Sequence, residues 1–168
     1  MALTQADFNR LIGEHGDALY RTAYRLMGNA HDAEDIVQEA FRSVWKSRDR
    51  YESERGDRAW LLSILRRRAV DRWRKRDSTE RTGGDELDRL AVRGADPLEN
   101  QYTDEVQHAL DGLHVDLRET LLLVVVGELT HQETADLLDI PIGTVLSRVS
   151  RARRQLRERL QAEKKHAV

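Results

Sequence analysis

The chain has 168 residues and a formal net charge of −2, which suits one compact domain or two very small ones. Charged residues make up 35% and hydrophobic residues 39%, so a large α/β fold around a single core is not expected. With no cysteine the sequence excludes disulfides, cysteine-ligated zinc and thiol catalysis, and with six histidines scattered singly we expect neither a metal site nor a cofactor.

The apolar pattern predicts neither a membrane span nor a secretion signal. The longest apolar run, residues 121–126, is far shorter than the ~20 residues that cross a bilayer. Residues 1–13 lack a basic segment followed by an apolar one. We therefore expect a cytoplasmic protein without membrane insertion.

Residues 5–76 have the apolar spacing of successive helices. Phe8, Leu11 and Ile12 begin an apolar stripe on a first predicted helix. A second predicted helix continues the stripe and ends at Gly28 and Asn29. The next helix has two adjacent apolar rows at four-residue spacing: Ile36, Ala40 and Val44, then Val37, Phe41 and Trp45. After a polar loop at residues 47–56, a helix of residues 57–76 is expected, whose buried side is formed by Leu61, Leu65 and Ala69.

The helical periodicity is lost in residues 78–103. This segment is polar and acidic, and it contains Gly83, Gly84 and Pro97. Such a composition predicts a flexible acidic linker, with at most a short helical turn at residues 87–92.

Helical spacing returns in residues 104–162. One stripe is formed by Val106, Ala109, Leu110 and Leu113, and a fully buried helix is expected around Leu117, Leu121, Leu122, Val124 and Val125. Thr130 and Glu133 have the spacing of a capping box, residues 139–141 end that short helix, and a last helix runs from about Gly143 and Thr144 past Leu160. The chain is thus expected to be all-α, with two small helical domains, residues 1–77 and 104–168, joined by the linker.

The net charge hides two basic blocks. Residues 51–77 have a net charge of +4 and residues 148–168 one of +6, whereas residues 78–105 have −5 and residues 106–147 have −6. The basic blocks are candidate surfaces for a polyanion, although charge runs on helices are more often simply solvated.

The second basic block has the layout of a helix-turn-helix. A short capped helix is followed by a turn and then by an arginine-rich helix, which begins with Thr144, Ser147, Arg148 and Arg151. Small and hydrogen-bonding residues at the start of such a helix suit a major groove, and its arginines suit phosphates. The alternative is an ordinary amphipathic helix at the end of a bundle.

The first basic block lies on one predicted helix that also contains Trp60 and Trp73. Its basic residues are Arg58, Arg66, Arg67, Arg68, Arg72, Arg74, Lys75 and Arg76. Basic residues interleaved with aromatic ones suit nucleic acid, single strands included, because bases stack on rings and guanidinium planes. For Trp60, which is in register with Leu61 and Ile64, a place in the core is the favoured interpretation.

Four motifs together resemble the extracytoplasmic-function (ECF) sigma factors of bacterial RNA polymerase. They are residues 32–41 (DAEDIVQEAF), 60–64 (WLLSI), 71–75 (DRWRK) and 140–148 (IPIGTVLSR). The resemblance covers residues ~5–77 and ~104–162 in matching order and spacing. It implies a binding protein that directs core polymerase to promoters, has no catalysis of its own, and is usually held by an anti-sigma factor.

The resemblance also implies roles for particular residues. The polymerase-binding segment would be Asp35, Gln38, Glu39 and Arg42. The minus-10 reader, which holds a base out of the stack, would be Tyr51, Asp57, Arg66, Arg67, Asp71, Arg74 and Lys75, with Tyr51 and the loop to Asp57 as the pocket wall. The minus-35 reader would be Thr144, Leu146, Ser147, Arg148, Arg151 and Arg154.

The chain departs from the family pattern at two of these positions. Arg67 stands where many members have asparagine, and Leu146 stands where lysine or arginine is common. An apolar side chain can contact a thymine methyl but cannot pair with guanine, so no family promoter sequence is transferred to this chain.

Two other functions remain open from the sequence. A dimeric helix-turn-helix regulator would bind palindromic operators without polymerase, but the acidic linker and the first basic helix argue against it. An enzyme is disfavoured because no carboxylate pairs with a histidine or nucleophile in a catalytic motif, and no phosphate-binding glycine loop is present.

Overall fold

The computed structural model describes residues 2–51, 56–81 and 101–166, and the chain forms two compact units, Met1–Gly94 and Ala95–Val168. The described residues contain seven α-helices, one short 3-10 helix and no strand, which confirms the all-α prediction. The division at residue 94 falls within the expected linker of residues 78–103. Most of that linker, including the expected turn at residues 87–92, lies outside the described residues, and the domain bounds stay a prediction.

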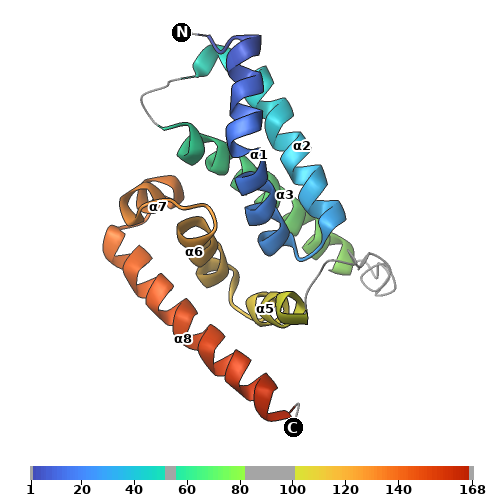
Figure 1. The fold of residues 1–168 in the computed structure, drawn as a ribbon, viewed down its shortest axis with the longest axis vertical. Coiled ribbons are helices and arrows are strands. Elements are labelled where there is room, and N and C mark those ends of the chain that lie inside the picture. Colours follow the sequence, from blue (N-terminus) through green and yellow to red (C-terminus); the bar gives the residue numbers. More distant parts are fainter. Residues whose placement is uncertain (1, 52–55, 82–100, 167–168) are drawn as a thin grey trace. The chain divides into compact units, whose positions relative to one another are not determined.

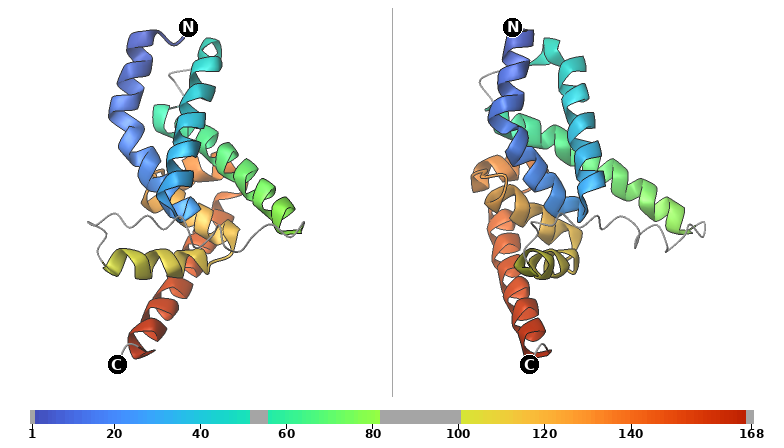
Figure 2. Two further views of the ribbon diagram at one scale, coloured as in Figure 1. Left: turned by 90° about the vertical axis from the view of Figure 1, so that its right-hand side faces the viewer. Right: turned by 45° about the vertical axis from the view of Figure 1, so that its right-hand side comes forward.

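The first unit is built from three long helices (Figure 1). They are α1 (Gln5–Met27), α2 (Ala30–Lys46) and α3 (Asp57–Arg81), with the 3-10 helix η1 (Arg48–Arg50) after α2. Helices α1 and α2 run antiparallel side by side, and α3 packs across both of them (Figure 2). Their common core contains the fully buried side chains of Leu11, Leu19, Ile36, Val44, Leu61, Leu62 and Leu65.

The expectation of two helices before Gly28 is wrong, because α1 is one continuous helix. Its apolar stripe keeps a single helical period from Leu11 to Met27, and burial of that stripe outweighs the low helix propensity of Gly13 and Gly16. The helix begins with a capping box at Thr4 and ends where Gly28 adopts a φ of 81°, which glycine tolerates at no steric cost.

The second unit consists of α5 (Gln101–Asp111), α6 (Val115–Val125), α7 (His131–Leu138) and α8 (Ile142–His166). Helices α5, α6 and α7 each pack against α8, the long helix at the end of the chain (Figures 1 and 2). The expectation that α6 is fully buried is wrong at its end, where Val125 is 52% exposed. In the described part of the chain no helix is both long and apolar enough to cross a membrane.

Helices α7 and α8 form the expected helix-turn-helix. The Thr130 hydroxyl accepts a hydrogen bond from the Glu133 amide, and the Glu133 carboxylate accepts one from the Thr130 amide, which confirms the capping box. Asp139 ends α7 in the left-handed region at φ 54°, and α8 then begins at Ile142, one residue before its expected start. The short turn fixes the angle at which α8 leaves α7.

Replacing a core isoleucine of the first unit tests this packing. Ile36 of α2 is fully buried, so Ile36→Ala is expected to lower the free energy of unfolding by about 2–5 kcal/mol. Ile12 of α1 is 40% exposed, so Ile12→Ala is expected to cost less than about 1 kcal/mol. Chemical denaturation measures both, and equal losses for the two variants would contradict the assignment of the core.

Candidate nucleic-acid interface

Most of the residues that are predicted to read the minus-35 element lie on the outer side of helix α8. Val145, Val149 and Ala152 are buried, and they alternate with the exposed residues at helical spacing. The side chains of Leu146, Ser147, Arg151 and Arg154 are exposed, and those of Thr144 and Arg148 are half-buried. The structure therefore brings the six predicted residues onto one helix, with four of them open to a ligand.

Two arginines of α8 contact the helices behind it. The Arg148 guanidinium lies 4.0 Å from the Asp116 carboxylate of α6, and Arg159 donates a hydrogen bond of 2.7 Å to the carbonyl oxygen of Gly112. These contacts attach α8 to the bundle near its start and near its end. The arginines between them, Arg151, Arg153, Arg154 and Arg157, are all exposed on this braced helix.

A basic pocket lies between the end of α2 and one face of α3. Trp60, Ile64, Arg67 and Arg68 are at positions i, i+4, i+7 and i+8 and so share a face of α3. Ser43, Lys46, Ser47 and Arg50 complete the lining from the other side. The pocket thus combines an aromatic ring and an aliphatic side chain with several cationic and hydroxyl groups.

Sequence reasoning found only part of this pocket. The sequence predicts Arg67 at the minus-10 reader, but it favours a core position for Trp60 and has no local signal that brings the end of α2 to this face. Trp60 is half-buried and lines the pocket. The available signal is the helical spacing of Trp60, Ile64 and Arg67, which places them on one face of a helix. The buried face of an ordinary helix has the same spacing, so the signal does not identify a pocket.

Tyr51 and Asp57 form a local network behind the pocket. The Tyr51 hydroxyl donates a hydrogen bond of 2.5 Å to the Asp57 carboxylate, which also lies 3.5 Å from the Arg10 guanidinium of α1. The Tyr51 ring packs against Trp60 with centroids 5.3 Å apart. Burial raises the pKa of Tyr51 above its ordinary value, the Asp57 carboxylate raises it further, and Arg10 opposes the rise. Tyr51 therefore braces Trp60, and Asp57 holds the Tyr51 hydroxyl. Residues 52–55 between them lie outside the described residues.

The remaining residues of the predicted minus-10 reader lie along α3. Arg67, Asp71, Arg74 and Lys75 are exposed, and Arg66 is half-buried. The Asp71 carboxylate lies 3.7 Å from the Arg68 guanidinium, which also donates a hydrogen bond of 2.8 Å to the Ser43 hydroxyl of α2. Asp71 therefore helps to orient a neighbouring arginine at the edge of the pocket.

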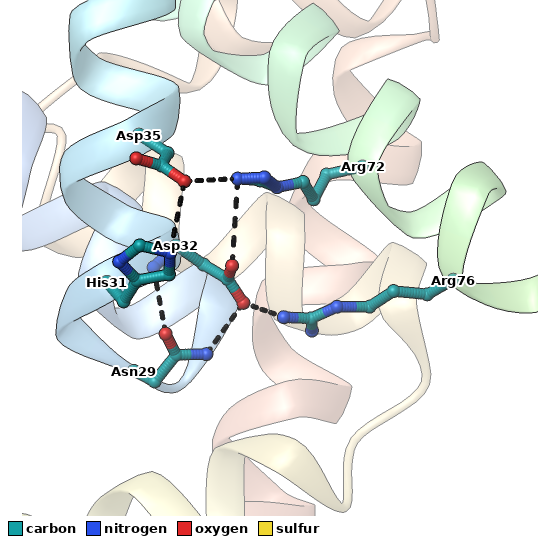
Figure 3. Close-up of polar contacts among 6 residues, drawn as sticks. All are labelled: Asn29, His31, Asp32, Asp35, Arg72 and Arg76. Carbon is teal, nitrogen blue, oxygen red and sulfur yellow. Dashed lines mark hydrogen bonds and ion pairs between the residues drawn. The ribbon is translucent and has the colours of Figure 1, made fainter. Parts of the chain in front are cut away.

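An ionic cluster joins the start of α2 to the second half of α3 (Figure 3). Arg72 donates a hydrogen bond of 2.7 Å to the Asp35 carboxylate and lies 3.7 Å from Asp32, which also pairs with Arg76. Asp32 itself accepts a hydrogen bond from the Asn29 amide group, and Asn29 caps α2. This cluster fixes the part of α3 that carries Arg74 and Lys75 against α2.

The residues expected to bind polymerase share one face of α2. Asp35, Gln38, Glu39 and Arg42 are at positions i, i+3, i+4 and i+7, and Gln38 and Arg42 are exposed. Asp35 is half-buried and is held by Arg72, with His31 3.5 Å away. The face is therefore polar, and Asp35 makes an intramolecular contact that the sequence does not predict.

Searched over residues 2–51, 56–81 and 101–166, the structure contains no group of three or more histidine, aspartate or glutamate side chains placed to hold a metal ion. Its candidate site is instead a pair of basic helix faces, one in each unit.

Both units match regions of one protein family. Residues 11–79 match Sigma-70 region 2, and residues 103–156 match Sigma-70 region 4. The ECF RNA polymerase sigma factor SigE of Mycolicibacterium smegmatis is 35% identical to this chain, over 91% of the chain and 61% of SigE. SigW of Bacillus subtilis, another ECF RNA polymerase sigma factor, is 30% identical over 93% of the chain and 90% of SigW.

Solved structures give the same result. The sigma factor RpoE of Bartonella quintana, crystallised with the anti-sigma factor NepR, superposes with a TM-score of 0.79 and 29% identity, over 92% of this chain and 97% of RpoE. CnrH, solved with the cytosolic domain of CnrY, has a TM-score of 0.71 and 28% identity, over 95% of this chain and 90% of CnrH.

A double-mutant cycle tests the ionic cluster. Because Arg72 and Asp35 form a charge-assisted hydrogen bond that is partly exposed, we expect Arg72→Ala and Asp35→Ala to show a coupling of about 0.5–1.5 kcal/mol in the free energy of unfolding. The matched cycle pairs Asp35→Ala with Arg74→Ala, an exposed arginine of the same helix, and is expected to be additive. Additivity in the first cycle would show that the pair does not hold α3 to α2.

The Tyr51 network predicts a dependence on alkaline pH. Since the pKa of Tyr51 is higher in the folded chain than its ordinary value of 10.0, the stability contributed by the neutral phenol is complete below pH 10.0 and is lost as the pH rises through the raised pKa. Tyrosinate absorbance of the wild type minus that of Tyr51→Phe isolates this titration.

Removing a carboxylate charge distinguishes this network from a general effect of alkali. Asp57→Asn is expected to lower the pKa of Tyr51 toward 10.0, whereas Asp49→Asn, at an exposed position of η1, should leave it unchanged. A Tyr51 titration that Asp57→Asn does not move would contradict the network.

Proposed function

The chain belongs to the ECF RNA polymerase sigma factors of the sigma-70 family, and from that membership we propose how its two units act. The chain would bind bacterial core polymerase, direct it to particular promoters and start transcription there. The first unit would bind the minus-10 element as a single strand, and the second unit the minus-35 element as a duplex. The observation that carries this proposal is the presence, in each unit, of a helix that buries an apolar side and exposes arginines.

For the minus-35 element, we propose that α8 enters the major groove. The start of α8 is exposed and carries small, apolar and hydrogen-bonding side chains, Leu146 and Ser147, with Arg151 one turn later. A helix of this kind fits the groove, where side chains reach base edges. Arg154 and the arginines further along would neutralise phosphates and position the helix.

For the minus-10 element, we propose that the pocket between α2 and α3 receives an unstacked base. Extrusion of a base from a duplex costs a few kcal/mol, which stacking and hydrogen bonds in the pocket must offset. The Trp60 ring and Ile64 offer an apolar surface, Arg67 offers donors, and Lys46 and Arg50 offer charge for the backbone. In this proposal Tyr51 and Asp57 act by positioning Trp60, rather than as the pocket wall.

For polymerase binding, we propose the outer face of α2. Gln38 and Arg42 are exposed there, and Asp35 and Glu39 are half-buried beside them. Their polar chemistry suits a wet interface with a charged helical partner, in which hydrogen bonds and ion pairs determine the register. Asp35 would keep its bond to Arg72 while its other oxygen contacts the partner.

Further partners and properties follow from the same proposal. The similar proteins RpoE, a sigma factor, and CnrH were each solved with a second protein, which is an anti-sigma factor in the case of RpoE. We propose that an anti-sigma factor also holds this chain. The chain would work in the cytoplasm, where the polymerase is, as a binding protein without catalysis or a cofactor of its own.

Reconstitution with core polymerase tests the proposed function. The purified chain should confer run-off transcription from a limited set of promoters on genomic DNA, whereas core polymerase alone should not. Sequencing of the transcript starts would give the promoter elements. A chain that bound palindromic DNA as a stable dimer, and gave no transcript with core polymerase, would instead be a helix-turn-helix regulator.

A further inference from the structure

Two large apolar side chains are exposed one turn apart at the start of α8. Ile142 is 43% exposed and Leu146 is 48% exposed, whereas Val145 and Val149 of the same helix are buried. The core of the second unit therefore already has its apolar residues from α8, and Ile142 and Leu146 are not among them. Exposed isoleucine and leucine at adjacent turns of a short apolar patch have a cost in water that a ligand would remove.

The neighbours of this apolar patch identify the chemistry of its ligand. Ser147 is exposed immediately beside Leu146, and Arg151 is exposed one turn beyond. A patch continuous with hydroxyl and guanidinium groups fits a surface that offers small apolar groups among hydrogen-bond acceptors and phosphates. The major groove of DNA is such a surface, and its one apolar group is the 5-methyl of thymine.

We propose that Ile142 and Leu146 read thymine methyl groups in the minus-35 element, an inference that rests on the proposed entry of α8 into the major groove. Leucine and isoleucine have no donor for the acceptors of guanine, so base pairs opposite these residues are selected by apolar contact. Arginine or lysine at position 146 would instead select guanine by bidentate hydrogen bonds. The side chain at this position thus determines whether A·T or G·C pairs are preferred at the bases it reaches.

Replacement of thymine by deoxyuridine removes the methyl and leaves the Watson–Crick pair and every hydrogen-bonding group intact. The test uses holoenzyme reconstituted from the full chain and core polymerase, and duplex promoters selected from a library randomised over the minus-35 element. We expect the selected sites to contain A·T pairs at the positions that α8 reaches first. Deoxyuridine at those thymines, one at a time, should weaken binding about fourfold per methyl.

Substitutions in the chain assign the effect to this patch. Leu146→Ala should weaken binding to the thymine promoter and remove the sensitivity to deoxyuridine at one thymine. Leu146→Arg should shift the selected base pair toward G·C. The matched control is Val125→Ala, which removes an exposed apolar side chain from α6 of the same unit and should leave the sensitivity to deoxyuridine unchanged.

The outcomes separate this inference from the function on which it rests. Sequence-specific binding by the wild-type holoenzyme that is insensitive to deoxyuridine at every thymine, or sensitivity that persists in both Leu146→Ala and Ile142→Ala, would overturn the inference and leave the proposed function standing. Failure of the wild-type holoenzyme to bind any duplex sequence-specifically would overturn both.

Discussion

The period of the α-helix is the constraint on which both units depend. A helix that must present arginines to a polyanion has to bury an apolar side elsewhere, since arginine itself is almost never buried without a partner. Helix α3 does so with Leu61, Leu65 and Ala69, and α8 with Val145, Val149 and Ala152. These apolar residues pack against neighbouring helices. Because that packing fixes the rotation of each helix about its axis, it also determines the direction in which the arginines between them point.

The carboxylates of the chain divide its arginines into two groups. Asp32 and Asp35 hold Arg72 and Arg76, Asp71 lies near Arg68, and Asp116 lies near Arg148. Arg72, Arg76 and Arg148 thereby join helices to one another, whereas the contact of Asp71 with Arg68 lies within α3. Arg67, Arg74, Arg151 and Arg154 are exposed on the same two helices. In the proposed function a basic segment is therefore only in part a binding surface, and its remaining charge orients the helix that would carry that surface.

The sequence was sufficient for the fold class and for most helices, because long apolar periods and the Thr130 capping box are local signals. It failed where local signals were missing or ambiguous. The prediction of two helices before Gly28 is wrong because the apolar stripe of α1 is continuous, and Val125 follows a buried run but lies at an exposed helix end. The family resemblance named Asp35, Arg67 and Arg151, but not the pairing of Asp35 with Arg72. That pairing joins residues 37 positions apart, which no helical period encodes.

The pocket beside Trp60 shows why such sites are difficult to find in a sequence. An aromatic residue in helical register with Ile64 has the same pattern whether it fills a core or lines a basic pocket. What distinguishes the two cases is the opposite wall, here the serines and basic residues at the end of α2, which come close only when the chain folds. Leu146 presents the reverse case, because its residue type is typical of a core whereas the family resemblance predicts a surface position, and the side chain is exposed in the structure. For Trp60 the position of the neighbouring helix decides between core and surface, and for Leu146 its register beside the buried Val145 and Val149 does so.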